Sequence, residues 1–211
     1  MRTLVSGETQ MTAMTLPSGD LFSVITTADR RTRSPSWKAM LNWPRFGDSH
    51  IDYSADTPAQ RNIWAARLDE AVLHAERPVL LVASGASCFA TAWWARLSPA
   101  NYVSRVAGAL LFTPLARTGA RDPELAEKFA SPRIALPFPS AIVSEEAGSG
   151  KWSEQVEALA ESWGSRFLES GWEREAIEGS AWNQAQGLIL RMTARVVERR
   201  MRVAEALGLA V

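Results

Sequence analysis

Short apolar runs separated by polar and amphipathic stretches recur along the chain from about residue 21 onward. Residues 79–83 and 106–112 are continuously apolar, which is typical of strands that are covered on both faces of a sheet. Residues 21–27 are rich in β-branched side chains and predict a first strand. Shorter runs at residues 140–143 and 165–168, and a less regular one at 50–53, predict the remaining strands.

Apolar residues at helical spacing fill the stretches between these runs. Trp64, Leu68 and Val72 form one such stripe within residues 58–76, and a stripe of this period predicts a helix with one face on a core. Further helices are predicted at residues 88–97, 154–163 and 184–207. Because strands alternate with helices, the pattern predicts an α/β fold, a three-layer αβα sandwich around a mostly parallel sheet of about five or six strands.

The composition fits one folded domain and narrows its partners. With 211 residues, the chain has the usual size of a single domain, which we place at residues 21–211, after a disordered arm at residues 1–20. The 23 basic and 23 acidic residues give a formal net charge of zero, which disfavours nucleic acid or an anionic membrane as the partner. No stretch is apolar enough to span a membrane, and the first residues do not resemble a secretory signal.

Cysteine, histidine and arginine usage limits the chemistry and indicates the source. A single cysteine, Cys88, excludes an internal disulfide and a cysteine-rich zinc site, and we expect it to pack in the core. The two histidines, His50 and His74, leave little for metal binding or general-base catalysis, so no metal and no cofactor are predicted. Arginine greatly outnumbers lysine, which indicates a bacterial genome rich in GC, and we expect a cytoplasmic location.

The turn after residues 79–83 has the layout of a nucleophile elbow. Within residues 78–95 a buried strand leads through four small residues, Ser84 to Ser87, directly into a helix. A strained strand-to-helix turn of this kind presents the nucleophilic serine of α/β-hydrolases at the top of the sheet. Because ligands of open parallel sheets bind at the carboxyl ends of the strands, this turn is the first place to seek a site.

These residues resemble the small serine hydrolases related to retinoblastoma-binding protein nine and bacterial YdeN, whose elbow reads roughly Leu-Val-Ala-His-Ser-Leu-Gly-Cys. Similar features follow in the same order at residues 106–111, 136–140 and 159–164. The resemblance covers about residues 21–190 and implies an α/β-hydrolase fold, in a family whose members are esterase-like serine hydrolases. The matching elbow residues are Leu81, Val82, Ala83, Cys88, Ala90 and Trp94.

The same resemblance places unsuitable residues at all three positions of the catalytic triad. It puts Gly85 at the nucleophile, Ala147 at the acid and Trp172 at the histidine. The order along a hydrolase chain is serine, acid, histidine, and no histidine follows His74. A serine without a base is a poor nucleophile at neutral pH, so the resemblance implies that the catalytic residues are lost. Glycine also relieves the strain of an elbow, because it adopts positive φ at little cost.

We therefore predict a catalytically inactive hydrolase-like protein, a pseudoenzyme, that binds a small apolar ligand or a protein partner. The alternative is an esterase-like serine hydrolase that uses a non-standard arrangement around Ser84, Ser87 and Glu146, although both serines also suit the capping of the next helix. A scaffolding role with a filled pocket is a third interpretation. The predicted pocket comprises Thr27, Ala28, Ser84, Gly85, Ala86, Ser87, Glu146 and Trp172.

Two further patterns leave alternatives open. Trp37, Trp43 and Trp172 are predicted nearer the mouth of the fold and suit an aromatic ligand pocket. An arginine stripe along the last predicted helix suits a solvated face near a helix C-terminus or, alternatively, an acidic protein partner. The stripe comprises Arg191, Arg195, Arg199 and Arg202.

Overall fold

A computed structural model describes residues 22–29, 48–53, 57–112, 114, 129, 134–144, 151–169 and 202. The predicted arm at residues 1–20 and, apart from Arg202, the predicted last helix with its arginine stripe lie outside the described residues. The same holds for five residues that the sequence suggests for the site, namely Trp37, Trp43, Glu146, Ala147 and Trp172.

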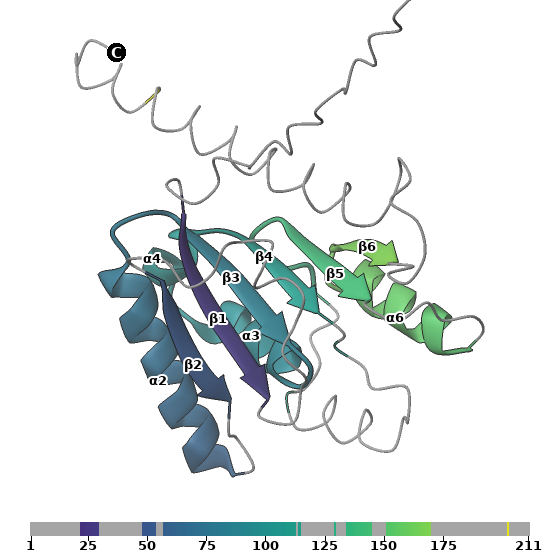
Figure 1. Cartoon of the computed structure of the whole chain (residues 1–211), viewed down its shortest axis with the longest axis horizontal. Helices are drawn as coiled ribbons and strands as arrows, with labels where there is room; N and C mark the ends of the chain where they lie inside the picture. Colours follow the sequence, from purple (N-terminus) through teal and green to yellow (C-terminus); the bar gives the residue numbers. More distant parts are fainter. Residues whose placement is uncertain are drawn as a thin grey trace, which may run out of the picture.

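Six strands form one sheet, in the order β2-β1-β3-β4-β5-β6 (Figure 1). Every adjacent pair is parallel, as the alternation of strands and helices predicts. The pairing register sets Ala28 beside Ser84 and sets Ser84 beside Phe112. The strands are β1 (Ser23–Asp29), β2 (Ser49–Tyr53), β3 (Val79–Ser84), β4 (Val106–Phe112), β5 (Ser140–Ser144) and β6 (Arg166–Glu169).

The predicted helices within the described residues form, with ends shifted by up to three residues. At the start of the helix Pro58–His74, Thr57 and Gln60 form a capping box, in which each side chain accepts a hydrogen bond from the other residue's backbone N–H. At its end, the Arg105 guanidinium donates to the carbonyls of Val72 and Ala75, where a cation is favoured. The described helices are α2 (Pro58–His74), α3 (Ser87–Leu97), the short α4 (Ala100–Val103), which the sequence did not predict, and α6 (Lys151–Ser162).

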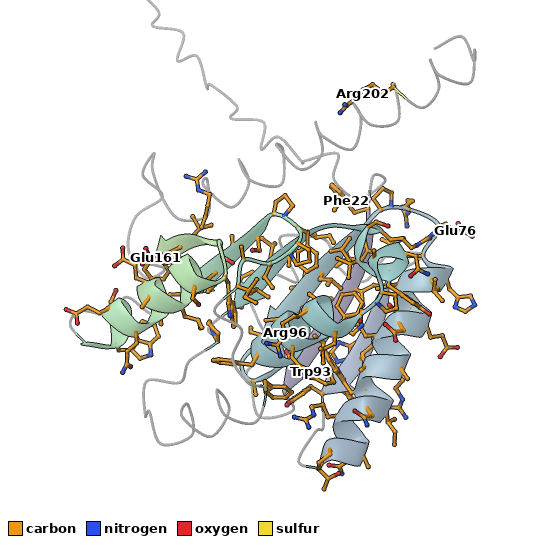
Figure 2. All side chains as sticks on the ribbon, turned by 180° about the vertical axis from the view of Figure 1, so that it is seen from behind. Phe22, Glu76, Trp93, Arg96, Glu161 and Arg202 are labelled. Atoms are coloured by element: carbon orange, nitrogen blue, oxygen red, sulfur yellow. The ribbon has the colours of Figure 1, made fainter. Side chains whose placement is uncertain are left out.

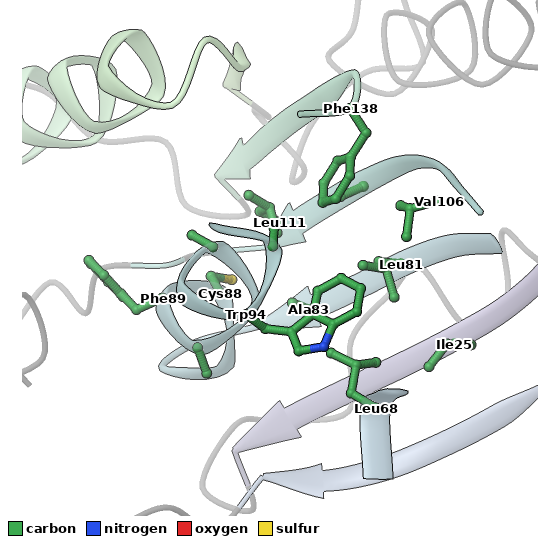
Figure 3. Close-up of a cluster of buried hydrophobic side chains, with 14 of the residues drawn as sticks. Ile25, Leu68, Leu81, Ala83, Cys88, Phe89, Trp94, Val106, Leu111 and Phe138 are labelled. Atoms are coloured by element: carbon green, nitrogen blue, oxygen red, sulfur yellow. The ribbon is translucent and has the colours of Figure 1, made fainter. Parts of the chain in front are cut away.

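The three longer helices share one core on one face of the sheet. Alternate residues of β3 face this core, and Figure 3 shows Leu81 and Ala83 of the strand next to Cys88 and Trp94 of α3. An indole–carboxylate hydrogen bond of 2.7 Å from Trp94 Nε1 to Asp69 Oδ1 joins α3 to α2. The large side chains of the core include Trp64, Leu68, Phe89, Trp94 and Trp163.

The other face of the same strands is buried as well. Leu80, Val82 and Leu110 alternate with the residues of the helical core and are at most 1% exposed. Burial on both faces is what the continuously apolar runs predict. The predicted three-layer α/β fold is therefore confirmed.

The strand order places a topological switch between β1 and β3. From β1 the chain passes to β2 on one side, whereas from β3 it passes to β4 on the other. Where connections diverge in this way, a crevice opens at the carboxyl ends of the strands, and ligands of open α/β sheets bind there. The turn that the sequence singles out, at Ser84 and Gly85, lies at this switch.

Candidate functional site

The turn between β3 and α3 has the backbone of an elbow. Gly85 has a φ of 65°, which lies in the left-handed region that glycine adopts at little cost. The N–H of Gly85 donates to the carbonyl of Phe112 on β4, at 3.0 Å. This contact fixes the turn against the neighbouring strand, so the positive φ that the elbow interpretation predicts is present.

Ser87 is an internal tether of this turn. Its side chain is fully buried, and its Oγ accepts a 3.1 Å hydrogen bond from the N–H of Ser84. The hydroxyl lies 2.9 Å from both the Ser84 and the Thr27 carbonyl oxygens, which share its single proton. These contacts tie the first residue of α3 to β3 and β1, so the hydroxyl is committed to holding the turn together.

Ser84, the last residue of β3, has the opposite character. Its side chain is 1% exposed, and its Oγ forms no hydrogen bond with any residue that the structure describes. Because side chains alternate along a strand, Ser84 faces away from the helical core that contains Ala83. The two serines beside Gly85 therefore lie in different surroundings: the Ser87 hydroxyl is hydrogen-bonded, whereas that of Ser84 has no partner among the described residues.

Thr27 connects this turn to α2. The indole N–H of Trp64 donates to Thr27 Oγ1 at 3.1 Å in the buried interior, while the Thr27 carbonyl accepts from Ser87. The structure thus brings together six of the eight residues of the predicted pocket. Three of these six, Ala28, Gly85 and Ala86, are partly exposed. The six are Thr27, Ala28, Ser84, Gly85, Ala86 and Ser87; the other two, Glu146 and Trp172, lie outside the described residues.

The first turn of α3 also supplies backbone donors. The first N–H groups of a helix have no partner within it, and Ala86, at the N-cap, has no side chain that caps the helix. Ser87 is the first residue of this helix, so its N–H and that of Ala86 are among these first donors. A hydrogen-bond acceptor of a ligand fits such a position.

Both histidines make contacts away from this turn. His50 Nδ1 lies 2.7 Å from Thr26 Oγ1, and His50 Nε2 lies 3.3 Å from Asp52 Oδ1. His74 Nδ1 lies 2.8 Å from the carbonyl of Glu70 on the exposed side of α2. Neither ring has the hydroxyl of Ser84 or Ser87 among its described contacts.

The chain of contacts through Thr26, His50 and Asp52 was not predicted from the sequence. Thr26 is completely buried in the middle of β1, and its hydroxyl also lies 3.3 Å from the Ser49 carbonyl. The sequence holds one signal for it, since His50 and Asp52 are two residues apart on a strand and therefore share a face. No feature of the sequence predicted the pairing of β2 with β1, which brings Thr26 beside His50.

Cys88 packs in the core, as predicted. It is fully buried, and its Sγ donates to the carbonyl of Phe112 at 3.5 Å. Desolvation by burial raises the pKa of the Cys88 thiol far above its ordinary value. A thiol in this state is protonated and inaccessible, so it is inert at neutral pH.

An aromatic cluster that the sequence did not predict lies beside the site. The Arg61 guanidinium stacks over the rings of Trp93 and Phe129, at 5.2 and 5.6 Å from their centroids. Tyr53 packs edge-on against Trp64 at 5.8 Å and lies 6.2 Å from Phe129. Figure 2 shows Trp93 on the helical face of the molecule. The cluster reaches the site through Trp64 and its bond to Thr27.

Among the described residues, no group of three or more His, Cys, Asp and Glu side chains is arranged to hold a metal ion. Nor is any helix in the described ranges long and apolar enough to cross a membrane.

A parallel sheet with a strand–glycine–helix turn of positive φ at its topological switch defines an α/β protein of the hydrolase type. The model of the serine hydrolase family matches residues 33–177, which is more than half of the chain, so the chain belongs to the serine hydrolase family.

A solved crystal structure of a similar protein supports the fold. The crystal structure of a protein from Pectobacterium atrosepticum, described as a YdeN-like hydrolase, is similar with a TM-score of 0.52 and 13% identity, covering 85% of this chain and 92% of that one. This likeness confirms the α/β-hydrolase-like fold. No curated protein matches the chain.

Proposed function

We propose that this member of the serine hydrolase family is catalytically inactive and binds a ligand at the turn around Gly85. The observation that carries the proposal is the positive φ of residue 85, at 65° in the strand-to-helix turn, where the family presents its nucleophile. Glycine has no oxygen with which to attack a carbonyl, so covalent catalysis from this position is impossible.

The neighbouring side chains support the same proposal. The Ser87 hydroxyl is buried and bonded to Thr27 and Ser84. The Ser84 hydroxyl has no hydrogen-bond partner in the described part of the chain, hence no imidazole to take its proton. Activation of a serine needs a base within hydrogen-bond reach.

The ligand that we propose is a small, mostly apolar molecule with one hydrogen-bond acceptor. Gly85 and Ala86 are small and partly exposed, and the first N–H groups of α3 point to an acceptor outside the helix. An ester or amide carbonyl satisfies such a donor. With no nucleophile opposite, the bound carbonyl is held and not cleaved.

A fluorophosphonate probe, which reacts with activated serines, tests the loss of catalysis. We expect the intact mass of the wild-type protein to remain unchanged after incubation, and p-nitrophenyl butyrate to hydrolyse no faster than in buffer. The His50→Gln variant is the matched control for background hydrolysis by an exposed imidazole. A stoichiometric adduct on the wild-type protein would refute the proposal.

Restoring the triad tests the assignment of the three replaced positions. The variant Gly85→Ser, Ala147→Asp, Trp172→His should gain fluorophosphonate labelling, whereas Gly85→Ser alone should not, because it lacks a base. A triple variant that shows the wild-type circular dichroism spectrum but no labelling would contradict the assignment of positions 147 and 172, which depends on the resemblance.

NMR chemical shifts of the backbone amides in the turn measure ligand binding. Titration with methyl butyrate should shift the Gly85 and Ala86 amide signals, and leave that of Gly164, on the loop after α6, in place. Unmoved signals at Gly85 and Ala86 together with a stable oligomer in solution would favour a scaffolding role instead.

One observation favours a second candidate, a hydrolase with a non-standard arrangement around Ser84. A buried hydroxyl without a partner is uncommon, and a catalytic role is one explanation for it; Ser84 Oγ is such a group within the described residues. Fluorophosphonate labelling that disappears in Ser84→Ala but persists in Ser87→Ala would establish this candidate in place of the first.

A further inference from the structure

We draw no further inference here: the strongest candidate, the hydroxyl–imidazole–carboxylate cluster of Thr26, His50 and Asp52 at the β1–β2 edge of the sheet, has a fully buried hydroxyl and described contacts on both ring nitrogens, and nothing in the structure shows a ligand that these groups would meet.

Discussion

Two regions of the sheet each contain some of the features that a hydrolase site needs. The turn after β3 has the positive φ of an elbow at Gly85 and the N-terminal end of α3, but no nucleophile at that residue. The edge between β1 and β2 has a hydroxyl, an imidazole and a carboxylate in sequence, from Thr26 through His50 to Asp52. Neither region combines the geometry with the groups.

The difference shows that position decides what such groups can do. Thr26 lies in the middle of a strand and is 0% exposed, so no carbonyl can approach its hydroxyl. Gly85 lies at the carboxyl end of the sheet and is partly exposed, where ligands of parallel sheets bind. Catalysis needs a nucleophile, a base and an approachable site within a few ångströms of one another. Among the described residues, the exposed turn and the hydroxyl–imidazole–carboxylate contacts lie at different places in the sheet.

Trp64 contacts β1 beside the turn and the end of β2, and its removal should have the largest effect. The indole donates to Thr27 beside the turn and packs against Tyr53 at the end of β2. Trp64→Ala should lower the free energy of unfolding by about 3–5 kcal/mol, as for other buried aromatic truncations. Urea unfolding measures this loss.

The Trp64→Phe variant separates the hydrogen bond from the packing. It keeps an aromatic ring against Tyr53 but leaves Thr27 Oγ1 without the indole donor. Losing this bond should cost about 1 kcal/mol, with a larger amide chemical-shift change at Thr27 than at His50. Equal losses in the alanine and phenylalanine variants would mean that the ring packs poorly, against the burial of Trp64 at 2% exposure.

The two serines that flank Gly85 should respond in opposite ways to truncation. Ser87→Ala removes the acceptor of the Ser84 N–H and the donor to the Thr27 carbonyl. Because these buried groups are then unsatisfied, we expect a loss of about 1–3 kcal/mol. Ser84→Ala removes a buried hydroxyl that has no described partner, so it should be neutral or stabilising.

Urea unfolding of both alanine variants measures this contrast. A Ser84→Ala variant that is less stable than Ser87→Ala would show that Ser84 makes an interaction of greater weight than the tether. It would also strengthen the case for a hydrolase built around Ser84.

At the β1–β2 edge, Thr26→Val should have a smaller effect than Ser87→Ala. Valine has nearly the shape of threonine, so the change removes the hydroxyl that lies near His50 Nδ1 and the Ser49 carbonyl with little loss of packing. Since the His50 side chain is 37% exposed, water can replace its lost partner, and we expect a cost of about 0.5–1.5 kcal/mol. Reactivity towards fluorophosphonate should stay at the wild-type level. A change in labelling would show that the edge takes part in chemistry.

The same comparison explains how far the sequence could lead. Continuous apolar runs such as residues 79–83 reveal buried strands, and the small residues around Gly85 reveal the turn, because both signals are local. The approach of His50 to Thr26, and of Arg61 to Trp93, depends on which strands and helices become neighbours. Such long-range pairings have no periodic signal in a single sequence.

Cys88, in the first turn of α3, gives an effect that depends on pH. Burial raises the pKa of its thiol in the folded protein, whereas the unperturbed value is 9.0. The unfolded chain therefore releases a proton above about pH 9 that the folded protein retains, and this favours unfolding. Stability from this group is fully present below pH 9 and should fall as the pH rises, by at most about 1.4 kcal/mol per pH unit.

The test is the difference in unfolding free energy between the wild-type protein and Cys88→Ala at pH 7.5 and pH 10. We expect the wild-type advantage to shrink at the higher pH, and a constant difference would mean that the thiol ionises in the folded state, in contact with water near the turn.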